Sequence, residues 1–397
     1  MTDPLTENRI EHTDESRSIN LFTAISIVVA NMVGTGVFTS LGFQAADIKS
    51  GFVLLMLWVV GGIFALCGAL SYGELGAAMP KSGGEYRYLS DIYHPVLGFL
   101  SGWVSMTVGF AAPIALAAIA FGKYFWRVFP VLNPTLLAIG LTIIISLIHT
   151  RNLHIGSVFQ NFSTVFKLTF ILIFIGCGLF LAQPQAIQFT PAVGDGSQLF
   201  SGAFAVSLVY VTYSYSGWNA IAYIAGEVKQ PETILPRSML IGTGIVTLLY
   251  CAINFIFLYT TPIEKIAGEL EVGYVAAESI FGLWGAKFMG LLISLGLIAS
   301  VSAMVLAGPR VIQAIGEDIP FFRIFARQNR QGVPYYGILL QLAIVLVLII
   351  TSTFETVATY LSFTITLSSC LTVLGVFVYR LKSPNSPKPY KTWGYPI

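Results

Sequence analysis

Long apolar runs alternate along the chain with short links that hold most of its charges, prolines and glycines. Each run is close to the ~20 residues that a helix needs to cross a lipid bilayer. Because an apolar stretch of this length is typical of a membrane helix, the pattern predicts ten spans. The predicted spans are 21–43, 51–78, 96–122, 134–150, 156–182, 199–226, 237–260, 279–307, 335–352 and 356–380.

The first span is interrupted at Gly34-Thr35-Gly36. Glycine in a helix interior is about 1 kcal/mol less favourable than alanine. Backbone groups freed by a helix break need partners in lipid, so a break is tolerated only where it lines a polar cavity. N–H groups at the start of the second half-helix attract anions. The break therefore predicts a site for a small anionic group such as a carboxylate; close helix packing through small residues is the alternative.

The sixth span has a similar break, at Ser214, Ser216 and Gly217. Five spans separate the two breaks, so the two interrupted helices run in opposite directions. Interrupted helices at corresponding positions of two oppositely oriented halves are typical of inverted-repeat transporters, which bind substrate at the breaks. Coincidence is the alternative explanation, since small residues are common in membrane helices.

Composition supports a membrane protein, because 55% of the 397 residues are hydrophobic and only 10% are charged. The mean hydropathy is +0.78, and a soluble domain carries about 25% charged residues. The chain is therefore predicted to be an all-α integral membrane protein in contact with the lipid bilayer. The net charge of +2 comes without a basic tract, so no nucleic acid partner is expected. Cysteines and histidines lack metal-ligand spacing, and neither a metal nor a cofactor is expected.

Lysine and arginine gather on one side of the predicted topology. With the N-terminus inside, fifteen lie on the inner side and five on the outer side, and Lys167 within a span completes the total of 21. Positive residues favour the cytoplasmic side, so both termini are predicted to be cytoplasmic and the protein to lie in the cell membrane. Residues 1–18 are predicted to form a cytoplasmic N-terminal tail, and 381–397 a cytoplasmic C-terminal segment.

Several motifs, taken in their order, carry a family resemblance. They are the broken segments 34–38 and 213–218, the loop 80–86 (Pro-Lys-Ser-Gly-Gly-Glu-Tyr), Glu227 with Pro231 and Pro236-Arg237, Gly308-Pro309-Arg310, and the final segment 389–396. In these motifs the chain resembles the amino acid–polyamine–organocation superfamily, and within it the bacterial amino acid permeases and L-type exchangers. The resemblance covers nearly the whole chain. The family usually continues with two further spans at the point where this sequence ends.

The resemblance implies a five-plus-five inverted-repeat fold like that of the leucine transporter, with discontinuous helices 1 and 6. Residues 19–182 would form the first repeat and residues 199–380 the second. It also implies a secondary transporter, not an enzyme, that moves L-amino acids by alternating access. Coupling is expected to be exchange for a counter-substrate or proton symport. The alternatives are an amine, polyamine or cationic amino acid carrier, and a sensor that binds amino acids without transporting them.

The resemblance places a zwitterionic amino acid substrate between the two breaks. The substrate carboxylate would meet the N–H groups of Gly34, Thr35 and Gly36. The substrate ammonium would meet carbonyl groups released by the breaks, and Gly217 completes the second break. These carbonyl groups belong to Met32, Val33, Tyr213, Ser214 and Ser216. Tyr213 and Trp218 are the candidate gate residues, and for Tyr213 ordinary aromatic packing is the alternative.

Lys167 is the one basic residue deep within a predicted span. It lies about eleven residues, or ~16 Å of helix, from the inner end of span five. A charge in hydrocarbon is costly and usually marks a functional site. The resemblance implies that its ammonium group bonds carbonyl groups near Gly34 and replaces the sodium ion of sodium-coupled relatives. A side chain that extends to the membrane interface is the alternative.

The substrate side chain is expected to be neutral, because spans one, three, six and eight have no acidic residue near their middle. The candidate contacts for that side chain are Phe110, Ser216, Ser300 and Ser302.

Ionic contacts are expected at the inner ends of the spans. Glu74 and Glu227 would pair with Lys or Arg of the loops, and Arg310 with Glu317 and Asp318. Exposed pairs of this kind contribute little to stability.

Overall fold

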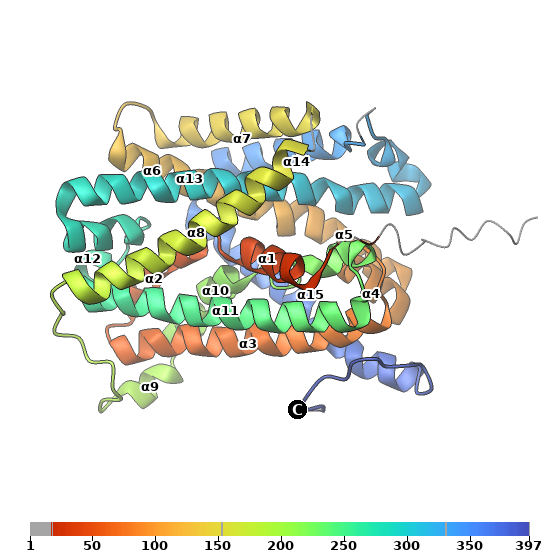
Figure 1. The fold of residues 1–397 in the computed structure, drawn as a ribbon, viewed down its shortest axis with the longest axis horizontal. Coiled ribbons are helices and arrows are strands. Elements are labelled where there is room, and N and C mark those ends of the chain that lie inside the picture. Colours follow the sequence, from red (N-terminus) through yellow and green to blue (C-terminus); the bar gives the residue numbers. More distant parts are fainter. Residues whose placement is uncertain (1–16, 18, 152–153, 330–331, 397) are drawn as a thin grey trace, which may run out of the picture.

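The computed structural model describes residue 17 and residues 19–151, 154–329 and 332–396, and within these ranges the side chains outside 151–163. Residues 1–16 and 18 of the predicted N-terminal tail lie outside this description. Nearly all of the described chain is helical (Figure 1). The α-helices are α1 (Leu21–Met32), α2 (Gly36–Asp47), α3 (Gly51–Ala78), α4 (Glu85–Ile92), α5 (Pro95–Val104), α6 (Ala111–Val128), α7 (Pro134–Arg151), α8 (His154–Leu181), α9 (Asp195–Leu199), α10 (Gly202–Tyr215), α11 (Pro231–Thr260), α12 (Ile263–Ile266), α13 (Val272–Asp318), α14 (Tyr335–Thr351) and α15 (Phe354–Lys382). The π-helix η2 (Ser105–Phe110) and the 3-10 helices η3 (Ala220–Glu227) and η4 (Pro320–Ala326) complete the set.

Helical segments cover all ten predicted spans. Seven helices or runs of consecutive helices in the described chain are long and apolar enough to cross a membrane. Two shorter apolar helices, α7 and α14, cover the fourth and ninth spans, and α10 with η3 covers the sixth. An all-α membrane fold is thus confirmed. The division into inverted repeats, 19–182 and 199–380, stays a prediction.

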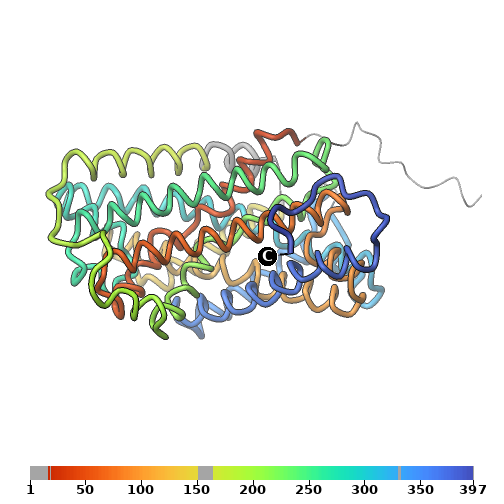
Figure 2. The backbone as a smooth tube through the Cα atoms, turned by 90° about the horizontal axis from the view of Figure 1, so that it is seen from below, coloured from red at the N-terminus to blue at the C-terminus, as the bar shows by residue number. Residues whose placement is uncertain are grey.

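The spanning helices run side by side along the long axis of the molecule (Figures 1 and 2). We call one end of this bundle the α4 end and the other the α12 end, after the short helices that lie there. The C-terminal segment after α15 folds back over the α4 end (Figure 2). By the predicted topology, the α4 end is the cytoplasmic one.

Two helices each continue through a proline that was predicted to lie in a link between spans. α13 continues through Pro309 to Asp318, so the expected loop after residue 307 begins as helix. α11 begins at Pro231 and contains Pro236, although 226–237 was expected to be a link. Both internal prolines are buried against neighbouring helices, and such packing re-satisfies the backbone groups that proline frees.

Both predicted helix breaks are present. α1 ends at Met32, and α2 begins at Gly36. α10 ends at Tyr215, and Gly217 beyond it has a φ of +100°, which a residue without a β-carbon adopts without strain. The chain then continues as the 3-10 helix η3. Helices 1 and 6 are therefore discontinuous, as predicted.

Candidate functional site

The two helix breaks lie against each other. A β-carbon built on Gly36 would lie 2.4 Å from Ser214 Oγ and 2.6 Å from Ser214 Cα, so the approach depends on glycine. The hydroxyl groups of Ser40 and Ser214 form a hydrogen bond of 2.8 Å. Those of Thr35 and Tyr213 also share a hydrogen bond. The sequence-distant segments are thus held together by four polar side chains and one glycine.

The start of α2 presents N–H groups without an acceptor in the described chain. These groups belong to Thr35, Gly36 and Val37. Gly34 differs from the prediction, because its N–H donates to the Met32 carbonyl at 2.8 Å. Unpaired N–H groups at a helix N-terminus carry partial positive charge. They form a suitable partner for a carboxylate.

Three of the carbonyl groups predicted to meet the substrate ammonium already accept hydrogen bonds from the protein. Met32 O accepts from the Tyr250 hydroxyl at 2.6 Å. Val33 O accepts from Lys167 Nζ at 3.0 Å. Tyr213 O accepts from the N–H of Ser216 at 3.0 Å and from its hydroxyl at 2.7 Å. Met32 O also accepts from the Gly34 N–H, so Met32 O and Tyr213 O each accept two hydrogen bonds and stabilise the breaks themselves. Val33 O accepts one and keeps a second lone pair for a substrate.

Lys167 connects three helices at the first break. Its side chain is buried, and its Nζ donates at 3.0 Å both to Val33 O and to Ser300 Oγ of α13. α8, which carries Lys167, crosses the middle of the bundle obliquely (Figure 1). The void beside Lys167, lined by Gly34 and Phe38 among others, measures about 10 Å³. The ammonium group therefore lies at the break and not at the membrane interface; its function as a sodium substitute stays a prediction.

A cavity of about 1700 Å³ extends from the α4 end to the second break. Exposed polar residues line its mouth, among them Lys81, Glu227 and Arg310. Its deep part is lined by Asn31, in the last turn of α1, and by 216–217 of the second break. Ligand pockets usually measure about 300–1,000 Å³, so this cavity has room for an amino acid and its water.

Only some of the predicted site residues line the deep end of the cavity. Ser216, Gly217 and Trp218 line it. The 34–36 loop does not line it. A β-carbon on Gly217 would be 2.8 Å from Asn31 O, which shows how closely the two backbones pass.

Of the four residues predicted to contact the substrate side chain, two line the cavity and two do not. Phe110 and Ser216 line the cavity. Ser300 and Ser302 do not, because each is buried and engaged elsewhere. Ser300 accepts from Lys167, and Ser302 forms a 2.8 Å hydrogen bond with Nε2 of the buried His149 of α7.

The two candidate gate residues lie on opposite sides of the breaks. Tyr213 is buried toward the α12 end, with its ring edge-to-face against Phe354 at 6.3 Å between centroids. Phe43 stacks on Phe354 at 5.9 Å and on Tyr210 at 5.2 Å, which extends this aromatic cover. Trp218 lines the cavity instead. The breaks are therefore covered on the α12 side, and the second break is open on the α4 side.

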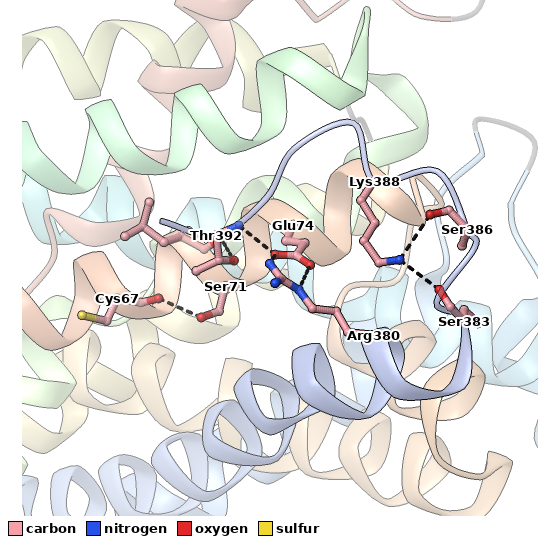
Figure 3. A network of polar contacts seen from close by, with 9 residues as sticks. Cys67, Ser71, Glu74, Arg380, Ser383, Ser386, Lys388 and Thr392 are labelled. Carbon is pink, nitrogen blue, oxygen red and sulfur yellow. Dashed lines mark hydrogen bonds and ion pairs between the residues drawn. The ribbon is translucent and has the colours of Figure 1, made fainter. Parts of the chain in front are cut away.

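One expected ionic contact is far more buried than predicted. Glu74 is fully buried in α3, and Arg380 of α15 binds both of its oxygens at 2.7 Å (Figure 3). The backbone N–H of Thr392 donates to the same carboxylate at 2.8 Å. Arg380 also lies over the ring of Tyr395 at 3.8 Å. This cluster fixes the C-terminal segment to α3 and α15.

The other ionic contacts are exposed. Arg310 pairs with Glu227 at 3.6 Å. It does not pair with Asp318 as expected, because Asp318 binds Arg87 at 3.3 Å. The remaining acid, Glu317, accepts a hydrogen bond from the side chain of Gln313.

Two residues of the cavity wall were not predicted as site residues from the sequence. Asn219, two residues after Gly217, lines the cavity and donates to Glu85 at 3.1 Å. Glu85 is a buried carboxylate that also lines the cavity. The available signal was an acidic residue inside the 80–86 motif, but no local pattern shows that it folds inward.

Helix breaks in contact, at the deep end of a one-sided cavity within a membrane bundle, are features of a permease. The chain belongs to the amino acid permease family, whose model matches residues 19–397. It is 29% identical over 396 residues to the serine/threonine exchanger SteT of Bacillus subtilis (strain 168), covering 97% of this chain and 89% of the relative. Identity to the b(0,+)-type amino acid transporter 1 of Mus musculus is 28%, covering 96% and 80%. Identity to the cystine/glutamate transporter of Homo sapiens is 27%, covering 94% and 76%.

Proposed function

We propose that the protein is a secondary transporter that exchanges neutral L-amino acids across the cell membrane by alternating access. The observation that carries the proposal is the cavity that reaches the second break and the last turn of α1 from the α4 end, while aromatic rings cover the breaks from the α12 side. The structure then corresponds to an inward-facing state, with the α4 end and both termini in the cytoplasm. Amino acid transport and exchange by the relatives named above support this assignment.

The substrate is proposed to bind as a zwitterion at the two breaks. Its carboxylate meets the N–H groups of Thr35, Gly36 and Val37, which lack acceptors in the described chain. Its ammonium group shares the carbonyls at the end of α1 and in the second break. Asn31 and Gly217 line the deep end of the cavity in close backbone contact, whereas the 34–36 loop does not line it. The substrate is proposed to reach the loop when these two backbones separate.

Selectivity for neutral side chains follows from the groups around the second break. Ser216, a hydroxyl residue, lines the deep cavity, and the acidic residues Glu227 and Glu317 lie exposed at its mouth. The acidic residue of the cavity wall beside the second break, Glu85, already accepts hydrogen bonds from Tyr72, Asn219 and Ser368, so a cationic substrate side chain would have to compete with these donors. An amine or polyamine carrier is therefore disfavoured.

Transport is proposed to be independent of sodium. The Lys167 ammonium group occupies the space between Val33 and Ser300 and supplies a fixed positive charge there. Replacing sodium by potassium or choline in the assay should leave the rate unchanged.

The decisive experiment is uptake by purified protein in liposomes. Vesicles are loaded with one unlabelled amino acid, and entry of a labelled neutral amino acid is measured against empty vesicles and with an imposed proton gradient. We expect strong stimulation by internal serine, threonine or another neutral amino acid, and weak competition by putrescine. Absence of uptake under every condition would refute transport. Thermal stabilisation by amino acids with no uptake would instead identify a sensor.

A substitution in the first break tests where the carboxylate binds. Gly34→Leu adds a side chain beside the unpaired N–H groups, although a β-carbon there would touch only Met32 O, at 3.9 Å. We expect loss of substrate binding with folding preserved. Gly140→Leu on α7, where a β-carbon meets nothing within 4 Å, is the matched control. Wild-type affinity of Gly34→Leu for a neutral amino acid would contradict the proposed carboxylate position.

A further inference from the structure

Glu85 is a buried carboxylate that the transport proposal does not use. It begins α4, outside the spanning helices, and its side chain is 5% exposed. It nevertheless lines the wall of the large cavity. A carboxylate in this position is shielded from bulk water and yet reached from the cavity.

Every recorded partner of the Glu85 carboxylate donates a hydrogen bond. The Tyr72 hydroxyl of α3 donates to Oε1 at 2.5 Å, and Asn219 Nδ2 donates to the same oxygen at 3.1 Å. Ser368 of α15 donates to Oε2, and Ser369 contacts Oε1 at 3.5 Å. An ionised carboxylate can accept from all of these hydroxyl and amide groups.

These contacts join parts of the molecule that are far apart in sequence. Tyr72 lies on a helix that packs on the second break, because Tyr72 meets Trp218 edge-to-face at 4.7 Å. Asn219 follows that break directly. Ser368 lies on α15. Glu85 therefore ties the segment after the break, through one side chain, to two helices that line the cavity.

No cation balances this charge within the described residues. Neither lysine, arginine nor histidine lies within 4.0 Å of the carboxylate. The titratable groups that face it are the hydroxyls of Tyr72 on α3, Tyr88 on α4 and Tyr223 on η3, while α15 presents only serine hydroxyls. Burial raises the pKa of the Glu85 carboxyl, although hydrogen bonds from Ser368 and Tyr72 oppose the rise. A buried charge without a partner is costly, so uptake of a proton is favoured.

We propose that Glu85 is a proton-binding site on the cavity wall, and that its charge holds the cavity open. In the ionised state, charge-assisted bonds hold Tyr72 and Asn219 against α15. A proton taken from water in the cavity makes one carboxyl oxygen a donor and converts the remaining contacts to neutral hydrogen bonds, which are about half as strong. The segment after the second break is then freer to move, and the cavity closes more readily.

The sign of the expected pH effect follows from these states. The ionised carboxylate, and with it the open cavity, predominates at high pH. As pH falls through the raised pKa, Glu85 is protonated and the closed state gains population. This inference builds on the proposed alternating access, but it concerns the cavity itself and does not need a transported substrate.

The test uses the thiol of Cys67, which lines the cavity, as a reporter of cavity opening. In the full-length protein, serine replaces the other three cysteines. The rate of labelling by a water-soluble maleimide is measured between about pH 8 and about pH 5, both above the usual carboxyl pKa of about 4.3. Each rate is divided by that of the Glu85→Gln variant at the same pH, which removes the pH dependence of the thiol reaction. Glu85→Gln mimics the neutral carboxyl group.

We expect the wild-type labelling rate to be about fivefold the Glu85→Gln rate at high pH, and the ratio of the two rates to fall toward one at low pH. A fivefold ratio corresponds to weakening one or two charge-assisted hydrogen bonds. Glu227→Gln, which neutralises an exposed carboxylate at the cavity mouth, should keep the wild-type profile. A ratio that does not vary with pH would overturn the inference.

Three further variants separate a proton site from a purely structural role. Ser368→Ala and Tyr72→Phe each remove one donor to the ionised carboxylate, so each should shift the midpoint of the profile to higher pH. Glu85→Asp keeps a carboxylate and should retain a pH-dependent ratio. Unshifted midpoints in both donor variants would contradict the proposal even if Glu85→Gln folds poorly. A pH-dependent ratio in protein that shows no amino acid uptake would support the proton site while refuting transport.

Discussion

The two ends of the bundle are held together by different kinds of contact. On the α12 side of the molecule, the broken helices meet within the bundle through Gly36 and Ser214, and aromatic rings cover them. The loop around α12 adds a backbone hydrogen bond from Gly268 to Gly42 and an ion pair of 2.8 Å between Arg127 and Glu269. At the α4 end a large cavity separates the helices, and polar clusters bridge the gap around it.

This difference shows how one end can open while the fold persists. Close packing of small residues and rings stabilises the α12 end by dispersion over many atoms. Around an open cavity such contacts are missing, so a few polar clusters, above all Glu74 with Arg380 and Glu85 with its donors, carry the connection. Polar contacts weaken or strengthen with charge and water access, whereas packed contacts do not. We therefore expect solution conditions to act mainly at the α4 end.

The largest expected effect breaks the main polar cluster of the α4 end. Arg380→Leu leaves the fully buried Glu74 carboxylate without its partner. Removing one member of a buried pair costs about 3–5 kcal/mol, so the thermal unfolding midpoint in detergent should fall sharply. Arg310→Leu, which removes the exposed pair with Glu227, is the control and should cost at most about 1 kcal/mol. Equal losses in the two variants would show that burial does not distinguish these pairs.

The second effect disrupts the close packing near the α12 end. Gly36→Ala places a β-carbon 2.6 Å from the backbone of Ser214, so the two broken helices must move apart. Overpacking of this kind costs about 1–3 kcal/mol, and we expect lower thermal stability and greater access of water-soluble reagents from the α12 end. Gly34→Ala has no neighbour closer than 3.9 Å and serves as the control. Unchanged stability of Gly36→Ala would show that the breaks are less tightly joined than the structure indicates.

The smallest expected effect on stability comes from removing one hydroxyl group beside the helix breaks. Tyr213→Phe keeps the ring against Phe354 but loses the hydrogen bond to Thr35. A single neutral hydrogen bond contributes about 0.5–1.5 kcal/mol. We expect little change in unfolding midpoint but a shift away from the inward-facing state, measured as slower labelling of Cys67 in the cavity. Faster labelling would show that this bond closes the cavity and not the opposite end.

Much of the fold follows from the sequence, because its signals are local. The length of each apolar run gave the ten spans, and the small residues at 34–36 and 214–217 gave both helix breaks. The same local rules failed at Pro236 and Pro309, where neighbouring helices keep the chain helical through a residue that ends helices in water. A rule about one segment cannot include the packing of another.

Part of the candidate site could likewise be predicted from the sequence, and part depended on the tertiary structure. The sequence by itself determined that a lysine lies deep within an apolar span, because each residue of helix advances the chain by a fixed distance. Only the tertiary structure decided that the carbonyls of Met32 and Val33 are already engaged, and that Glu85 folds inward to meet Asn219 and Ser368. It also decided which end is open. These features depend on contacts between residues more than a hundred positions apart, and such contacts exist only when the helices are packed.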